Sequence, residues 1–116
     1  METGLQFTYA IDPIVLLANG RVTGQVQILD NPFKALFLVA TSTGRFTALI
    51  KDGSSKRPFS NVEVIDTLQW GTAQNPMPLL QPYVFSQRGQ IQVDVTDISA
   101  AGNTIRLAFI GVELVG

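Results

Sequence analysis

Residues 90–114 read QIQVDVTDISAAGNTIRLAFIGVEL and hold two different strand patterns separated by a turn. In residues 90–97 apolar and polar side chains alternate, which predicts a strand with one buried face and one face in water. In residues 105–114 both faces are apolar, and neither segment has a helical period. This stretch therefore predicts β-structure in which something must cover the second face of the last strand.

The same two patterns occur earlier in the chain. Residues 21–29 alternate cleanly, whereas residues 34–41 are apolar on both faces. Prolines and turn-forming pairs such as Asn19-Gly20 separate these short β-prone runs, a spacing typical of an all-β sandwich or barrel. We therefore predict an all-β fold, a single antiparallel β-sandwich of about eight strands that covers residues 1–116.

Two segments are predicted to be less regular than the rest. Leu5 to Tyr9 is predicted as a first short strand, which Asp12-Pro13 interrupts because proline has no N–H to give to a sheet. Residues 1–13 could alternatively form an extended N-terminal arm. Residues 71–82 carry three prolines and predict an irregular extended connection rather than a helix. Either segment could reach across a neighbouring surface.

The composition excludes several classes of function. The chain has 116 residues, of which 46% are hydrophobic and 15% charged, and its net charge of −1 gives no electrostatic case for binding nucleic acid or an anionic membrane. It has no cysteine and no histidine, so it lacks thiolate chemistry, the commonest general base and the commonest metal ligand. The first ten residues, METGLQFTYA, lack the basic start and the apolar run of a signal peptide. We predict a soluble, intracellularly made protein that is not an enzyme and holds no cofactor or metal.

The remaining candidates for chemistry are better explained as turns. Asp94 and Asp97 are three residues apart on a predicted strand, which places them on opposite faces and argues against the paired carboxylates of a glycosidase. Asp97, Ser99 and Asn103 lack the ligand spacing of a calcium loop, and all three residue types are common in turns.

Trp70 is open to two interpretations. A lone tryptophan in a β-domain is most often a core residue. An exposed Trp70 or Tyr83 beside Gln69 and Gln81 would instead form the stacking platform of a carbohydrate-binding sandwich. That module is the alternative function from another class.

The doubly apolar strands raise the question of what covers their second face. One answer is internal, since residues 71–82 could cross over it. The other is a second subunit, since monomers rarely leave large apolar patches in water, and the low charge favours this answer. The side chains predicted to face a partner are Leu36, Leu38, Ile110, Val112 and Leu114. Those predicted to lie in the core are Phe37, Val39, Leu107 and Phe109, although the pattern alone allows the two sets to be exchanged.

The C-terminal third contains a series of strand and turn features in a fixed order. A proline-flanked strand at residues 78–85 leads to Gly89 and an alternating strand, an S-x-x-x-N turn follows at residues 99–103, and the last strand contains F-x-G at residues 109–111. This order resembles small structural proteins of tailed bacteriophages. The turns and strands from residue 33 onward are compatible with the same family.

The resemblance implies a virion protein with a jelly-roll-like sandwich, made in the host cytoplasm, with no enzymatic activity and no cofactor. The expected role is a capsid decoration, cement or minor head protein that self-associates and binds between subunits of the major capsid protein. A tail, collar or head–tail connector component is the alternative position.

Overall fold

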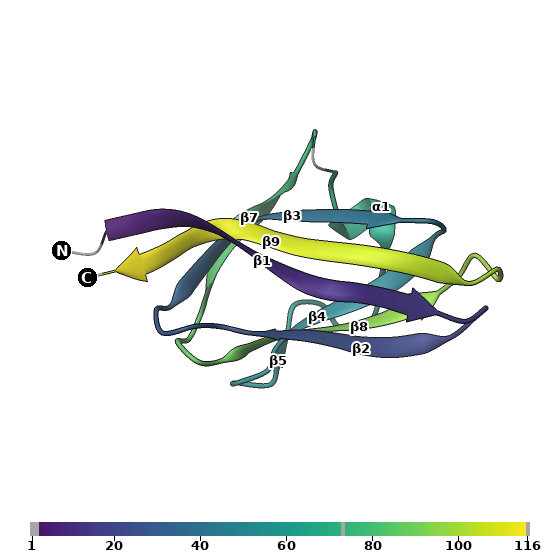
Figure 1. The fold of residues 1–116 in the computed structure, drawn as a ribbon, viewed down its shortest axis with the longest axis horizontal. Helices are drawn as coiled ribbons and strands as arrows, with labels where there is room; N and C mark the ends of the chain where they lie inside the picture. Colours follow the sequence, from purple (N-terminus) through teal and green to yellow (C-terminus); the bar gives the residue numbers. More distant parts are fainter. Residues whose placement is uncertain (1–2, 73, 116) are drawn as a thin grey trace.

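The computed structural model describes residues 3–72 and 74–115 and shows two antiparallel β-sheets packed as a sandwich (Figure 1). The predicted all-β sandwich is therefore confirmed. The molecule is elongated, with principal extents of 49 × 29 × 24 Å. The elements in chain order are β1 (Thr3–Leu16), β2 (Arg21–Gln27), β3 (Phe33–Ser42), β4 (Phe46–Asp52), β5 (Arg57–Pro58), β6 (Val64–Ile65), α1 (Asp66–Gln69), β7 (Met77–Phe85), β8 (Gln90–Asp97) and β9 (Asn103–Val115).

The strand order is that of a jelly roll. One sheet, named here the β9 sheet, has the order β1-β9-β3-β7, and the other, the β8 sheet, has the order β2-β8-β4-β5 with β6 also paired to β4. Most chain connections cross from one sheet to the other, and the first and last strands lie side by side in the same sheet (Figure 1). Double-sheet sandwiches with this winding are the jelly rolls of viral capsid proteins, lectins and cupins.

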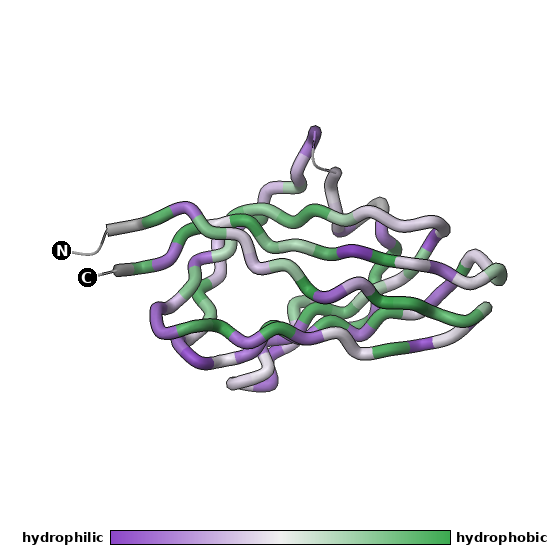
Figure 2. The backbone as a smooth tube through the Cα atoms, in the orientation of Figure 1, coloured by the Kyte–Doolittle hydropathy of each residue, from purple (hydrophilic) through white to green (hydrophobic). Residues whose placement is uncertain are grey.

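The core lies between the two sheets and is rich in phenylalanine. The alternating strands behave as their sequences predict: Ile91, Val93 and Val95 of β8 are fully buried. The β9 sheet has a row of inward-facing side chains of its own, and Figure 2 shows long hydrophobic stretches along β3 and β9. The largest fully buried side chains include Phe33, Phe46, Phe85 and Phe109.

The N-terminal segment is a strand rather than a separate arm. Residues 3–13 belong to β1, which pairs with β9 from Thr3↔Val115 to Leu16↔Asn103. Asp12-Pro13 does not end the strand but forms a bulge, because the pairing register shifts between Ile11 and Ile14. The described part of this segment is therefore a paired strand that includes the one predicted at Leu5–Tyr9, and residues 1–2 lie outside the described residues.

The proline-rich connection does not cover the second face of the β9 sheet. It becomes a strand at Met77, and β7 takes the edge of the sheet, where Pro78 and Pro82 are tolerated. Before β7 the chain runs beside β3, where Gly71 accepts a hydrogen bond from the Ala40 N–H at 2.8 Å. Gly71 and residues 77–82 therefore extend the sheet at its edge, and the internal cover considered from the sequence is not found among the described residues.

Helix contributes little to this fold. α1 is a single turn of four residues that precedes Trp70. In the part of the chain that the structure describes, no helix has the length and hydropathy of a membrane span.

Candidate interaction surface

The outward-facing side of the β9 sheet, named here the outer face, is largely apolar. Its side chains form rows across the strands, because residues opposite one another in an antiparallel pair share a face. The register gives three such rows: Ala10, Ala108 and Val39; Thr8, Ile110, Phe37 and Pro78; and Gln6, Val112, Lys34 and Val84. Phe37 is 37% exposed and Val84 46% exposed, far more than the fully buried core phenylalanines. The centre of this sheet is therefore apolar on both sides, as the sequence predicts.

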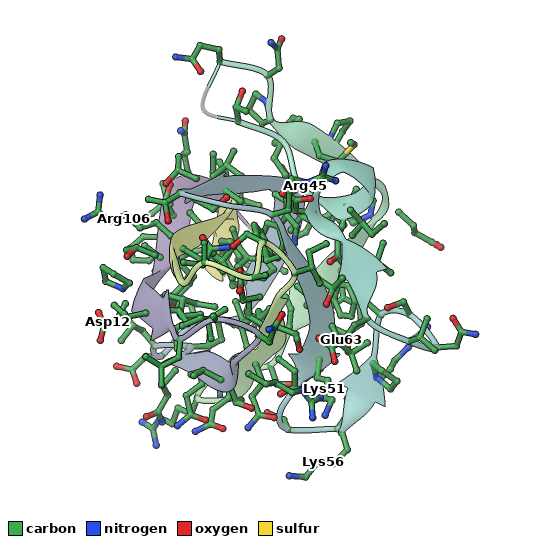
Figure 3. The ribbon with its side chains drawn as sticks, turned by 90° about the vertical axis from the view of Figure 1, so that its right-hand side faces the viewer. Asp12, Arg45, Lys51, Lys56, Glu63 and Arg106 are labelled. Carbon is green, nitrogen blue, oxygen red and sulfur yellow. The ribbon has the colours of Figure 1, made fainter. Side chains whose placement is uncertain are left out.

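A shallow groove of about 360 Å³ runs over the outer face beside the β1 bulge. Ala10, Pro13, Val39 and Ala108 are among the residues that line it. Two charged side chains, Asp12 and Arg106, also line it, and they point away from the sandwich on the same side of the molecule (Figure 3). Neither has an ion pair within the described residues, so this face offers both apolar area and two unengaged charges.

A bulge in β3 changes which predicted residues belong to this surface. The register of β3 against β9 shifts between Ala35 and Phe37, so Leu36 is the extra residue and the side chains after it exchange faces. Leu38 is only 3% exposed and lies in the core, whereas Phe37 is on the outer face. The predictions for Leu38 and Phe37 are therefore both wrong.

The other nominated residues lie as follows. Ile110, Val112 and Leu114 of β9 are half-buried, as is Leu36. Leu107 and Phe109 are buried in the core as predicted. Val39, predicted as core, is instead half-buried and lines the outer groove. Contact of Leu36, Ile110, Val112 and Leu114 with a partner stays a prediction.

The opposite side of the molecule, the outer side of the β8 sheet, is polar and internally satisfied. Asp94 accepts a hydrogen bond from the Thr23 hydroxyl at 2.7 Å and pairs with Lys51 at 2.9 Å and Arg21 at 3.4 Å. Although burial raises the pKa of Asp94, these partners outweigh burial and lower it below its usual range. Glu63 accepts hydrogen bonds from Thr96 and Thr47 nearby. The charged groups of this face are thus paired with one another, unlike Asp12 and Arg106 on the outer face of the β9 sheet.

Asp97, Ser99 and Asn103 form a turn lock, as the sequence indicates. The Asp97 carboxylate accepts hydrogen bonds from the Asn19 N–H at 2.8 Å, the Ser99 N–H at 3.0 Å and the Ala100 N–H at 3.1 Å. Asn103 accepts from the Gly44 N–H at 3.0 Å. Three loops at one end of the sandwich are thereby joined. Among the described residues there is no group of His, Cys, Asp and Glu that could hold a metal ion.

Asp97→Asn is expected to make the unfolding free energy depend less on pH in the acidic range. The Ser99 hydroxyl, and then the backbone donors and Asn103, hold the pKa of Asp97 well below its usual range despite the opposing effect of burial. A carboxyl with a lowered folded-state pKa stabilises the native state above its unfolded pKa of about 4, and this contribution is lost as the pH falls toward the folded pKa. Urea unfolding between pH 7 and pH 2 should show the gap between wild type and variant closing in acid.

The control for Asp97 is Asp30→Asn, since the Asp30 side chain is 83% exposed. Its unfolding free energy should follow that of the wild type throughout this pH range. A constant gap between Asp97→Asn and the wild type from pH 7 to pH 2 would contradict the assigned role of the turn lock.

Trp70 is a core residue. It is 6% exposed, and its ring meets the edge of Phe109 at a centroid distance of 5.5 Å. Tyr83 is half-buried and its hydroxyl donates to Asp52 at 2.6 Å, beneath the Arg57 guanidinium. The platform that a carbohydrate-binding sandwich would need at Trp70 is therefore absent.

Comparison of the chain with protein-family models and with curated proteins finds no match. The fold and the two unlike outer surfaces are therefore the features that bear on function. A fold is shared by proteins of many functions, so the surfaces are the more specific of the two.

Proposed function

We propose that this protein is a bacteriophage virion structural protein, a capsid decoration, cement or minor head protein that binds between subunits of the major capsid protein. The observation that supports this most is the apolar outer face of the β9 sheet, which nothing in the described residues covers. Apolar area removed from water contributes about 25 cal/mol per Å². A protein with one apolar and one polar face is suited to lie between a protein lattice and water.

The jelly-roll topology supports the same proposal. Viral capsid proteins and lectins both use this winding, so the topology alone favours neither. The buried Trp70 disfavours the lectin-like alternative, because a sugar needs an exposed aromatic face to stack on. Repetition of a weak contact around a symmetric shell also strengthens binding through avidity, so a small chain can suffice as cement.

The tail, collar or head–tail connector is the second position in which such a protein could act. The same apolar face would serve in a ring. Particles purified on a density gradient and treated with nuclease distinguish the positions: a capsid protein should stay with tailless heads, and a tail component should separate with detached tails. A chain absent from both fractions overturns the proposal.

Ile110→Asp is expected to remove the protein from particles without unfolding it. Ile110 is half-buried at the centre of the outer face, so a carboxylate there stays in water in the free protein but would be buried unpaired in a complex. Occupancy in purified particles should fall about tenfold or more, which corresponds to about 1.4 kcal/mol per site. Circular dichroism should show a retained cooperative unfolding transition.

The matched control is Ile98→Asp, which makes the same chemical change in a loop where the side chain is 46% exposed. This variant should be incorporated like the wild type. If Ile110→Asp is incorporated as well as Ile98→Asp, the outer face is not the binding surface.

A further inference from the structure

The edges of the two sheets are protected very unequally. An edge strand presents unpaired N–H and C=O groups, and proteins usually block it with proline, charge, a bulge or a very short strand. β7 carries Pro78 and Pro82, and β5 is only two residues long and ends in Pro58. β2 is short, with seven residues, and has Gly24 in its middle. These three edges are poor templates for another strand.

β1 is the exception. It is the longest strand, with 14 residues, and forms one of the two edges of the β9 sheet, opposite β7. Its one protective feature is the bulge at Asp12-Pro13. Residues 3–11, TGLQFTYAI, contain no charged residue and no proline. This stretch is thus an unprotected edge that ends sharply at the bulge.

We infer that residues 3–11 of β1 pair antiparallel with the same residues of a second copy of this chain, about a two-fold axis perpendicular to the sheet. A two-fold axis brings a strand against itself in the antiparallel sense, which is the more stable pairing. The absence of charge in residues 3–11 means that no like charges meet across the axis. The bulge sets the limit of the pairing at Ile11.

Continuity of the outer face argues for a second copy as the occupant. The rows that cross the outer face reach β1 at Gln6, Thr8 and Ala10. Pairing of two β1 edges would join the rows of both copies into one continuous sheet surface, with the uncharged side chains of Gln6, Thr8 and Ala10 at the junction and the apolar centres of the two copies on either side. The ends of β1 and β9 lie together at one end of the molecule, and no other strand lies beyond β1 in the sheet (Figure 1). The inference concerns the free protein and does not depend on the proposed virion role.

The absence of cysteine permits a direct test by disulfide cross-linking. Gln6, Thr8 and Ala10 are exposed and share the outer face, so Gln6→Cys, Thr8→Cys and Ala10→Cys should leave the fold intact. Directly opposed residues in a sheet have Cβ atoms about 5 Å apart, close enough for a disulfide after small adjustment. Residues that oppose each other across the axis lie on the same face of the sheet. The axis therefore lies midway between the two β1 strands, level with one residue of each.

The three variants, alone and in pairwise mixtures, cover every axis from Gln6 to Ala10. An axis level with residue 6, 8 or 10 pairs that variant with itself, and an axis level with residue 8 also pairs Gln6→Cys with Ala10→Cys. An axis level with residue 7 or 9 pairs the two variants on either side of it. The combinations that a single axis brings opposite each other should form disulfide dimers at least about tenfold faster than the others, because paired thiols have an effective concentration in the millimolar range.

The control is Val84→Cys on the proline-protected β7 edge, where the side chain is 46% exposed. Light scattering should also show a dimer for the wild type, and for Ile110→Asp, whose altered side chain lies on β9 rather than on the β1 edge. A monomer by light scattering, with every cross-linking rate equal to that of Val84→Cys, overturns the inference. A dimer that Ile110→Asp abolishes would instead assign self-association to the outer face.

Discussion

Gly111→Ala is expected to be among the most damaging single substitutions in this chain. An alanine Cβ at this position would overlap the Lys34 carbonyl oxygen and lie 3.0 Å from the Ala35 Cα, both backbone atoms of β3. Neither can turn away as a side chain could, so the pairing of β3 with β9 has to open near the bulge. We expect a loss of about 3 kcal/mol or more in the unfolding free energy, measured by urea denaturation.

Gly20→Ala serves as the comparison for Gly111. Its Cβ would come no closer than 3.0 Å to the Leu17 backbone, in a turn between β1 and β2 at the end of the sandwich. The cost there should be about 1 kcal/mol or less. Equal losses at the two positions would mean that the close approach of β3 and β9 does not constrain the fold.

Phe109→Ala is expected to cost about 4 kcal/mol, because a phenylalanine with no solvent exposure leaves a cavity when it is truncated. The ring lies against both Trp70 and Phe85, at centroid distances of 5.5 and 6.3 Å, so its loss weakens the aromatic core on two sides. A domain of this size has roughly 5–15 kcal/mol of stability in total. Thermal unfolding should therefore show a much lower midpoint.

Ile110→Ala, one residue further along β9, is the matched control for Phe109. Ile110 faces outward and is half-buried, so the free protein should lose less than half as much stability as it does in Phe109→Ala. A greater loss at residue 110 than at residue 109 would reverse the assignment of the two faces of β9.

Much of the fold could be predicted from side-chain alternation. The alternating strands β2 and β8 and the doubly apolar β3 and β9 were all recognisable, because the period of two reports directly on which faces are buried. Turn residues marked strand ends such as Asn19, which has φ 58°. They did not reveal the pairing, since β1 and β2 enter different sheets. A turn fixes the local path of the chain, whereas pairing depends on contacts between distant segments.

The candidate surface was predicted in kind but not in every residue. The sequence indicated an apolar outer face on the last strand, and Ile110 and Val112 lie there. In β3 the bulge at Leu36 places Leu38 in the core and Phe37 on the outer face, the reverse of the prediction. A one-residue shift moves every later side chain to the other face. Gly111 was the available signal, because a glycine inside a strand often marks a close backbone approach.

The position of β9 has a consequence for biosynthesis. This strand lies between β1 and β3, which precede it in the chain and do not pair with each other. During translation, β1 and β3 therefore remain without the strand that pairs with both until β9 has been synthesised. Formation of strand pairs between segments far apart in the sequence is intrinsically slow. A chain cut short before Asn103 would lack the strand that joins the first strand to the rest of its sheet. Only molecules translated through β9 therefore have the complete outer face.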